Sequence, residues 1–211
     1  MSPGQATPAL TSATFVDFLA DIFERRGGEE YLGESVTMSQ HMLQAARFAE
    51  QANQPDDVIA AALLHDIGHF TSEFGTYSPD DTEDRHHAEE GGRLLAPFFP
   101  PRVVDCVRHH VAAKRYLCAT RPAYFNKLSP ASVHTLGLQG GPMGADEVTA
   151  FERQPHLQDI IKVRVYDEAG KRADMQTPPF AYYAPMLQRI IHGHCASAHF
   201  ASHRSGETGN R

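Results

Sequence analysis

The sequence has few of the features that mark secreted or membrane proteins, and these absences narrow its class. Only three of its 211 residues are cysteines, and Cys106, Cys118 and Cys195 form no CxxC pair. Neither a disulfide framework nor a zinc–thiolate site is therefore predicted. No apolar run approaches the roughly 18 residues of a membrane-spanning helix, and the N-terminus lacks the charged segment and apolar core of a signal peptide. We therefore expect a soluble, cytoplasmic protein.

Long basic segments are also absent. The chain carries 19 Lys and Arg against 26 Asp and Glu, a formal net charge of −7 at pH 7. This balance argues against nucleic acid or an anionic membrane as the main partner, and nothing implies a protein partner. The length suits one fairly large domain with a substantial core. Histidine, by contrast, is abundant, with 13 residues.

An apolar stretch at residues 58–64 leads directly into His65 and Asp66. Pro55 and the two aspartates after it suit the N-terminus of a helix. Because a helix that is apolar on all sides is a buried one, this helix should deliver an imidazole and a carboxylate into the interior. A buried carboxylate needs a partner, which can be a metal ion or the hydrogen bonds of nearby backbone. The two residues alone leave both partners open.

The spacing of apolar residues, with Gly and Pro at the breaks, predicts an all-α chain with one domain. The expected helices span residues 12–26, 37–53, 86–96, 101–117, 129–137, 145–153, 157–167 and 182–194. The buried helix that ends at Gly68 lies between the second and the third of these. The segment 157–166 is compatible with strand or helix, and the all-helical context favours helix. We expect residues 1–11 to be loose, residues 12–195 to form the domain, residues 196–211 to be a disordered tail, and residues 71–84 to be a surface loop near the site.

Histidines and aspartates lie at or near the ends of these predicted helices. The candidates are His41, His65, Asp66, one of His86 and His87, one of His109 and His110, and Asp167. Imidazole and carboxylate together suit divalent first-row metals better than calcium or magnesium. Because one carboxylate can bridge two ions, four histidines and two aspartates are enough for a dinuclear site with open positions. Any one of these histidines alone is more often an ordinary surface or core residue, so the prediction depends on their joint placement.

The order of His41, His65-Asp66 and Asp167 resembles the H…HD…D signature of the HD-domain superfamily, and His87 and His110 match two further histidines of its dinuclear members. Four stretches are more specific: YLGE at 31–34, HVAAKRYL at 110–117, QGGPM at 139–143 and KVRVYD at 162–167. With them, residues 29–172 resemble the HD-domain mixed-valent diiron oxygenases that cleave the carbon–phosphorus bond of 1-hydroxy-2-aminoethylphosphonate and its N-trimethyl analogue.

The resemblance implies a ligand set. His41, His65, Asp66 and Asp167 would bind one iron, and Asp66, His87 and His110 the other, with Asp66 as the bridge. His86 and His109 are then neighbours of the ligands. The implied cofactors are two iron ions in a mixed Fe2+/Fe3+ state, with O2 as co-substrate; the ligand types alone would equally permit manganese or zinc. Tyr31 would occupy an iron position at rest and leave when the substrate arrives.

The resemblance also implies which residues meet the substrate. Glu34 would face the substrate's ammonium group, and the positions around the phosphonate or just outside the metal ligands are His69, Lys114, Ser132, Gln139 and Arg164. A phosphonate dianion calls for charge-assisted donors, which a lysine and an arginine supply. Taken without the resemblance, Lys114 and Arg164 could lie on a solvated helix face, Ser132 could be a helix cap, and Gln139 an ordinary loop residue. Glu34 could simply favour the N-terminus of the following helix.

The implied reaction is O2-dependent cleavage of the carbon–phosphorus bond of (1R)-1-hydroxy-2-aminoethylphosphonate or its N-trimethyl analogue, as in organophosphonate catabolism. The products would be phosphate and glycine or glycine betaine. Three alternatives compete: an HD phosphohydrolase that directs water at a phosphate ester, a regulatory protein with a decayed HD fold, and another diiron oxygenase such as one acting on inositol. A hydrolase does not require the Tyr31–Glu34 pair, all six ligand positions are filled, and the phosphonate-type motifs weigh against the third alternative.

The amine end of the substrate stays open. Glu34 can neutralise a primary ammonium or a trimethylammonium group. A quaternary cation prefers an aromatic surround, for which the available residues are Tyr31, Phe70, Phe74, Tyr77 and Tyr124.

Overall fold

The structure is a computed structural model that describes residues 10–31, 33–71, 82, 84 and 86–205. The helices of this part are α1 (Phe15–Arg26), α2 (Met38–Gln51), α3 (Asp56–Leu64), α4 (Gly68–Thr71), α5 (His87–Leu95), α6 (Pro101–Thr120), α7 (Pro122–Phe125), α8 (Pro130–Leu138), α9 (Ala145–Phe151), α10 (Leu157–Ala169) and α11 (Phe180–Ser205). One isolated β-bridge, between Glu30 and Thr37, is the only extended pairing among these residues. The predicted all-α class is confirmed.

Several of the predicted helix ends are wrong, and three of them bear on the site or on the C-terminal segment. Gly68 does not end the buried helix: α3 stops at Leu64, and Gly68 begins the short helix α4. Helix α10 runs past Asp167 to Ala169. The backbone N–H of Gly170 then donates a hydrogen bond to the carbonyl oxygen of Asp167 and completes the last turn. Helix α11 continues through residues 196–205, which the sequence analysis placed in a disordered tail. This stretch contains no proline and no glycine to stop a helix.

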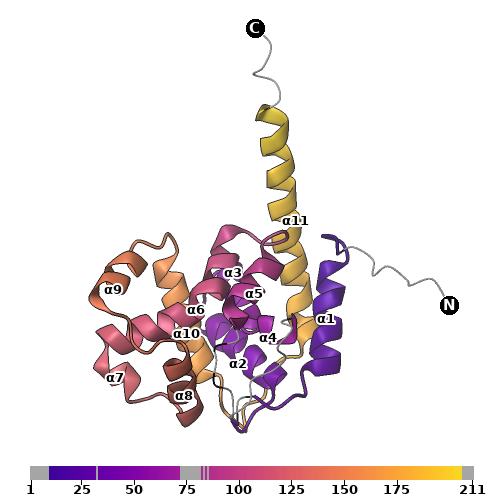
Figure 1. Cartoon of the computed structure of the whole chain (residues 1–211). Helices are drawn as coiled ribbons and strands as arrows, with labels where there is room; N and C mark the ends of the chain where they lie inside the picture. The colour runs from indigo at the N-terminus through magenta and orange to yellow at the C-terminus, as the bar shows by residue number, and fades with distance from the viewer. Residues whose placement is uncertain (1–9, 32, 72–81, 83, 85, 206–211) are drawn as a thin grey trace, which may run out of the picture.

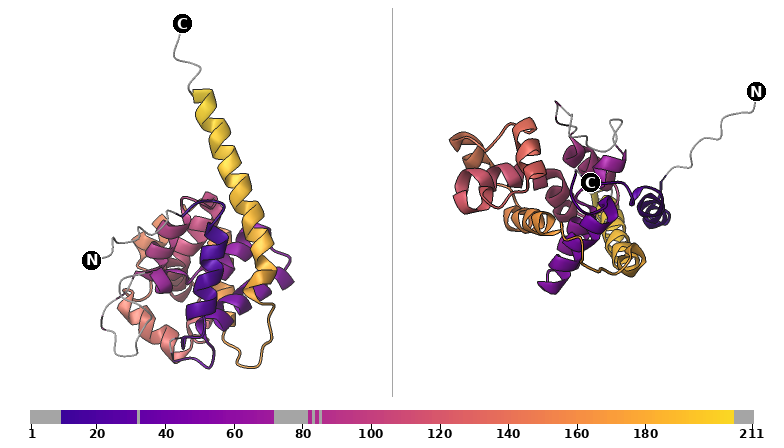
Figure 2. Two further views of the ribbon diagram at one scale, coloured as in Figure 1. Left: turned by 90° about the vertical axis from the view of Figure 1, so that its right-hand side faces the viewer. Right: turned by 90° about the horizontal axis from the view of Figure 1, so that it is seen from below.

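Helix α6 lies at the centre of the fold and packs against α3, α5 and α10, while α2 packs against α3 and α10. Figure 1 shows α7, α8 and α9 on one side of this centre and α1 with α11 on the other. The last part of α11 projects from the body, as Figure 2 also shows. None of the described helices is both long and apolar enough to span a bilayer.

Helix α3 is buried on all sides, as its sequence predicts. All seven residues from Val58 to Leu64 are buried in the core. Side chains such as Leu63 and Leu64 each stabilise the fold by about 1.5–3 kcal/mol through burial. The end of α3 therefore has a fixed place in the interior, and so do His65 and Asp66, which follow it.

A close backbone contact brings α5 to the same place. A Cβ atom on Gly68 would lie 1.9 Å from the carbonyl oxygen of His87 and 2.7 Å from the backbone nitrogen of Gly91. Only glycine fits at such a distance. The turn after Asp66 can therefore lie directly against the first residue of α5, which places His87 beside Asp66.

Candidate active site

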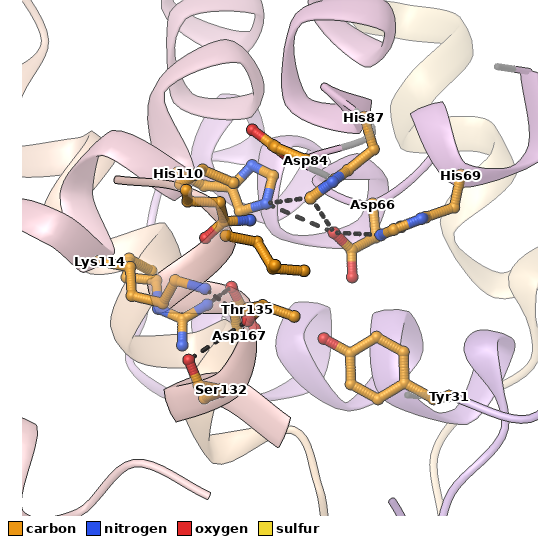
Figure 3. A pocket seen from close by; sticks show the side chains of 14 residues that line it. Tyr31, Asp66, His69, Asp84, His87, His110, Lys114, Ser132, Thr135 and Asp167 are labelled. Carbon is orange, nitrogen blue, oxygen red and sulfur yellow. Dashed lines mark hydrogen bonds and ion pairs between the residues drawn. The ribbon is translucent and has the colours of Figure 1, made fainter. Parts of the chain in front are cut away.

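Six side chains from five parts of the fold converge in the interior. They are His41 of α2, His65 and Asp66 after α3, His87 of α5, His110 of α6 and Asp167 of α10, and all six are buried. Helices that are distant in sequence thus bring all six predicted ligands together. Figure 3 shows the Asp66 carboxylate beside His87, His69 and His110, with Asp167 across the pocket.

The two carboxylate oxygens of Asp66 face different pairs of histidines. Oδ2 lies 3.4 Å from His41 Nε2 and 3.3 Å from His65 Nε2. Oδ1 lies 3.3 Å from His87 Nε2 and 3.4 Å from His110 Nε2. Asp66 therefore joins two groups of side chains, a first cluster with His41 and His65 and a second cluster with His87 and His110. A bridging ligand requires this arrangement.

Asp167 completes the first cluster. Its Oδ1 lies 3.4 Å from His41 Nε2 and 3.7 Å from His65 Nε2. This buried oxygen accepts no hydrogen bond from any described residue. A buried carboxylate oxygen without a donor is costly unless a cation faces it.

The hydrogen bonds of the histidines favour a cation as well. His41 Nδ1 lies 2.9 Å from Gly170 O, His65 Nδ1 2.8 Å from Ala62 O, and His110 Nδ1 2.7 Å from Val107 O. Because a carbonyl can only accept, Nδ1 carries the proton in each neutral ring and Nε2 presents its lone pair. His41 Nε2 and His65 Nε2 are only 2.9 Å apart. A metal ion accepts both lone pairs, and this kind of backbone support is typical of metal-binding histidines.

The carboxylates of Asp66 and Asp167 favour a positive charge beside them, either a protonated histidine or a metal ion. Although burial opposes it, the charges of Asp66 and Asp167 raise the pKa of His65 to about 9. In the second cluster burial prevails and lowers the pKa of His110 to about 4. The donor set and its charge fit divalent first-row metals.

His69 lies beside His87 and Asp66. Its ring stacks on that of His87, with centroids 4.0 Å apart, and its Nε2 lies 3.9 Å from Asp66 Oδ1. Asp66, His69 and His87 are close enough to hold an ion among themselves. Burial, with the charge of His87, lowers the pKa of His69 well below its usual value, so its ring stays neutral.

The two histidine doublets each place one member in the cluster. His87 and His110 point inward, whereas the side chain of His86 is 74% exposed and His109 lies half-buried near Phe151. The choice between the members, which the residues alone left open, follows from this burial.

A pocket adjoins both clusters. It is lined by the ligand candidates Asp66, His87, His110 and Asp167 and by Tyr31, His69, Lys114, Ser132, Thr135, Gln139 and Arg164, among others. Figure 3 shows the Tyr31 hydroxyl turned toward the pocket from the side opposite His87. A molecule in this pocket would meet the ligand candidates and cationic side chains together.

Lys114 and Arg164 are only 3% and 4% exposed, so they do not lie on a solvated helix face. Lys114 Nζ donates to Thr135 Oγ1 at 2.8 Å, and burial, with the charge of Arg164, lowers its pKa to about 7. Arg164 donates to Tyr124 Oη at 2.7 Å, to Asp167 and to Glu168. These bonds use three of its five N–H donors.

One face of α8, together with its C-cap residue Gln139, contributes three polar side chains to the pocket. Ser132 is not the helix cap, because Ser129 Oγ fills that place and accepts from the backbone N–H of Ser132. Gln139 Oε1 is buried and accepts no hydrogen bond within the described part of the chain. Thr135 was not among the predicted site residues, although its spacing of three residues from Ser132 places it on the same helix face.

Tyr31 and Glu34 lie on a tight turn. Gly33 adopts φ +74°, a conformation that favours glycine, and the Glu34 N–H donates to Tyr31 O at 2.7 Å. The Tyr31 ring stacks on His41 with centroids 3.8 Å apart. Burial, with the charges of Asp66 and Asp167, raises the pKa of Tyr31 well above its usual value.

Glu34 is not the cap of the following helix, because Thr37 caps α2. It does not line the pocket directly either. Its Oε1 is buried, has no hydrogen-bond partner in the described part, and lies 3.5 Å from Lys171 Nζ.

The candidate aromatic residues separate into three groups. Tyr31 lines the pocket and Tyr124 supports Arg164. The ring of Phe70 instead faces the guanidinium group of Arg26. Phe74 and Tyr77, like most of the expected loop 71–84, lie outside the described residues.

Comparisons with known proteins show what the chain is similar to. Residues 38–136 match the HD domain model. The chain is 62% identical over 185 residues, 88% of this chain and 94% of the relative, to [1-hydroxy-2-(trimethylamino)ethyl]phosphonate dioxygenase (glycine-betaine-forming) of Leisingera caerulea. It is 40% identical over 165 residues, 78% of this chain and 82% of the relative, to hydroxymethylphosphonate dioxygenase of Gimesia maris.

Proposed function

Because this chain belongs to the HD-domain phosphonate dioxygenases, we propose that it cleaves the carbon–phosphorus bond of [1-hydroxy-2-(trimethylamino)ethyl]phosphonate with O2. The carbon that bears the hydroxyl group is oxidised to the carboxylate of glycine betaine, and the phosphonate leaves as phosphate. One O2 accepts the four electrons and supplies two oxygen atoms, and one proton is released, so no other reductant is needed. The identity of 62% across nearly the whole relative carries this proposal.

The proposed metal site has two ions. His41, His65, Asp66 and Asp167 would hold the first, and Asp66, His87 and His110 the second. The division of the two Asp66 oxygens between the histidine pairs supports this assignment. When bound, two irons of mixed valence would supply the activation of O2 and the redox chemistry. His69 then remains a neutral ring beside the second ion.

Lys114 is the proposed main contact of the phosphonate group, with Ser132, Gln139 and Arg164. An anion next to a buried lysine stabilises the ammonium form, so the substrate should raise the pKa of Lys114 from its value of about 7. Arg164 retains two N–H donors for phosphonate oxygens while its other bonds fix the guanidinium plane. These residues neutralise and orient the phosphonate so that the hydroxyl-bearing carbon lies beside the metal ligands.

Tyr31 would occupy a metal position at rest and leave when substrate binds. Its place in the pocket and its stacking on His41 support this role.

Glu34 would neutralise the trimethylammonium group. This group has no N–H, so it requires negative charge nearby but no acceptor at hydrogen-bond distance. The buried Glu34 Oε1, which lacks a hydrogen bond from any described residue, meets that requirement.

A competition among phosphonates tests the proposal. We expect the wild-type protein to release phosphate faster from the trimethylamino substrate than from its primary-amine analogue or hydroxymethylphosphonate. Glu34→Gln should lower the preference for the trimethylamino substrate over hydroxymethylphosphonate about ten-fold, because hydroxymethylphosphonate has no cationic group for the carboxylate to neutralise. A wild-type preference for the primary amine would contradict the assignment of glycine betaine as the product. An unchanged preference in Glu34→Gln would contradict the role of Glu34.

A further inference from the structure

Lys171 lies just after the end of α10 and holds its ammonium group in a fixed place. Its side chain is 10% exposed. Nζ donates to Ser129 Oγ at 3.2 Å, to Ser132 Oγ at 2.8 Å and to Glu168 Oε1 at 3.1 Å. These bonds use all three N–H donors of the ammonium group. Lys171 therefore has no donor left for Glu34, although its charge lies 3.5 Å from Glu34 Oε1.

Charges of alternating sign continue from this pair to the metal ligands. Glu34 faces Lys171, Lys171 is bonded to Glu168, and Glu168 to Arg164. Arg164 in turn is bonded to Asp167. The row connects the residue proposed for the cationic end of the substrate with a residue proposed for the phosphonate. Every member depends on its neighbours for compensation of a charge that is largely buried.

We propose that Lys171 is a positioning residue that fixes the Glu34 carboxylate for the cationic end of the substrate, and thereby sets the selectivity for cationic phosphonates. This inference rests on the proposed function, since it takes Glu34 as the partner of the trimethylammonium group.

Two observations support it. Lys171 is the charged partner of Glu34 in the described structure, and Glu34 Oε1 lacks any hydrogen bond there. Without Lys171, a buried carboxylate would lose its compensating charge and would turn toward solvent. Lys171 itself cannot follow the substrate, because its three donors hold it to Ser129, Ser132 and Glu168.

The test compares binding of two ligands that differ in the cationic end. Dissociation constants of [1-hydroxy-2-(trimethylamino)ethyl]phosphonate and hydroxymethylphosphonate are measured by calorimetry on metal-loaded protein without O2, so that no turnover occurs. Lys171→Met removes the charge, and Lys171→Gln removes the charge but keeps a hydrogen-bonding side chain, in case the first variant does not fold. Lys162→Met is the matched control, because Lys162 of α10 is also paired with a carboxylate, that of Asp159, but its side chain is 44% exposed.

The quantity compared is the affinity for the trimethylamino ligand divided by the affinity for hydroxymethylphosphonate. We expect Lys171→Met or Lys171→Gln to lower this ratio about ten-fold, mainly by weakening the binding of the trimethylamino ligand. Lys171→Arg should keep most of the wild-type ratio. Lys162→Met should leave the ratio unchanged. Equal weakening of both ligands would mean that Lys171 only supports the fold, and a higher ratio would mean that it competes with the substrate's cation; either result would overturn the inference. Failure of the proposed function is a separate observation, since the wild-type protein would then release no phosphate in the presence of O2.

Discussion

Substitution of Lys114 by methionine should make the protein more stable and less able to bind its substrate. Burial, with the charge of Arg164, lowers the pKa of Lys114 from 10.5 to about 7. The folded protein therefore binds fewer protons than the unfolded chain between about pH 7 and about pH 10.5, and the stability of the fold rises with pH over this interval. Below about pH 7 the full cost is present, at most about 5 kcal/mol.

Methionine has a similar length and no charge, so Lys114→Met should raise the free energy of unfolding by a few kcal/mol near pH 7. The gain should shrink toward zero as the pH approaches about 10.5, where the unfolded lysine also becomes neutral. Urea unfolding of both proteins at about pH 7 and about pH 10, with chelator present, measures the two differences. A gain that does not depend on pH would refute the role given to the buried charge.

The same variant should lose the charge-assisted hydrogen bond to the phosphonate. Such a bond contributes about 1.5–3 kcal/mol, so the KM for the phosphonate should rise about 10- to 150-fold. The stability measurement is the control, because a variant that is more stable cannot owe its weaker binding to unfolding. If Lys114→Met were destabilised and bound the substrate normally, both parts of the reasoning would be wrong.

The remaining predictions concern the metal ligands and Arg164. His41→Ala and His110→Ala should each lose one of two bound metal ions, whereas Asp66→Ala should lose both; metal analysis after dialysis measures this, and two retained ions in Asp66→Ala would disprove the bridge. Arg164→Met should lower the free energy of unfolding by about 3–5 kcal/mol, because it leaves Asp167 buried without its arginine partner and Glu168 with Lys171 alone as a cationic partner. Thermal unfolding would show this loss, and an unchanged midpoint would mean that those carboxylates find other partners.

Much of the fold could be predicted because the apolar residues repeat at helical spacing and proline or glycine marks many of the breaks. Helix α3 is the clearest case, since seven consecutive apolar residues can only be buried. Errors arose where the same residue type is compatible with two structural roles. Gly68 reads as a helix stop, yet its lack of a side chain serves a close contact with His87 that involves residues far apart in the sequence.

The site shows the same limit. The metal ligand candidates could be chosen from residue types and a known resemblance, and the structure brings them together. Thr135 was missed, although helical spacing from Ser132 could have indicated it. Lys171 and Glu168 could not be found from the sequence, because their contacts with Glu34 and Ser132 depend on how α8 and α10 pack with the turn before α2. Charge networks of this kind are properties of tertiary packing, and no local pattern encodes them.

The most direct test of the account is the stoichiometry of the reaction. Iron-loaded protein is given [1-hydroxy-2-(trimethylamino)ethyl]phosphonate, and O2 consumption, phosphate and glycine betaine are measured together. We expect one O2 to be consumed for each phosphate and each glycine betaine formed, and no phosphate in the absence of O2. Phosphate release that continues unchanged without O2, or that occurs only from a phosphate ester, would contradict the account and identify a hydrolase.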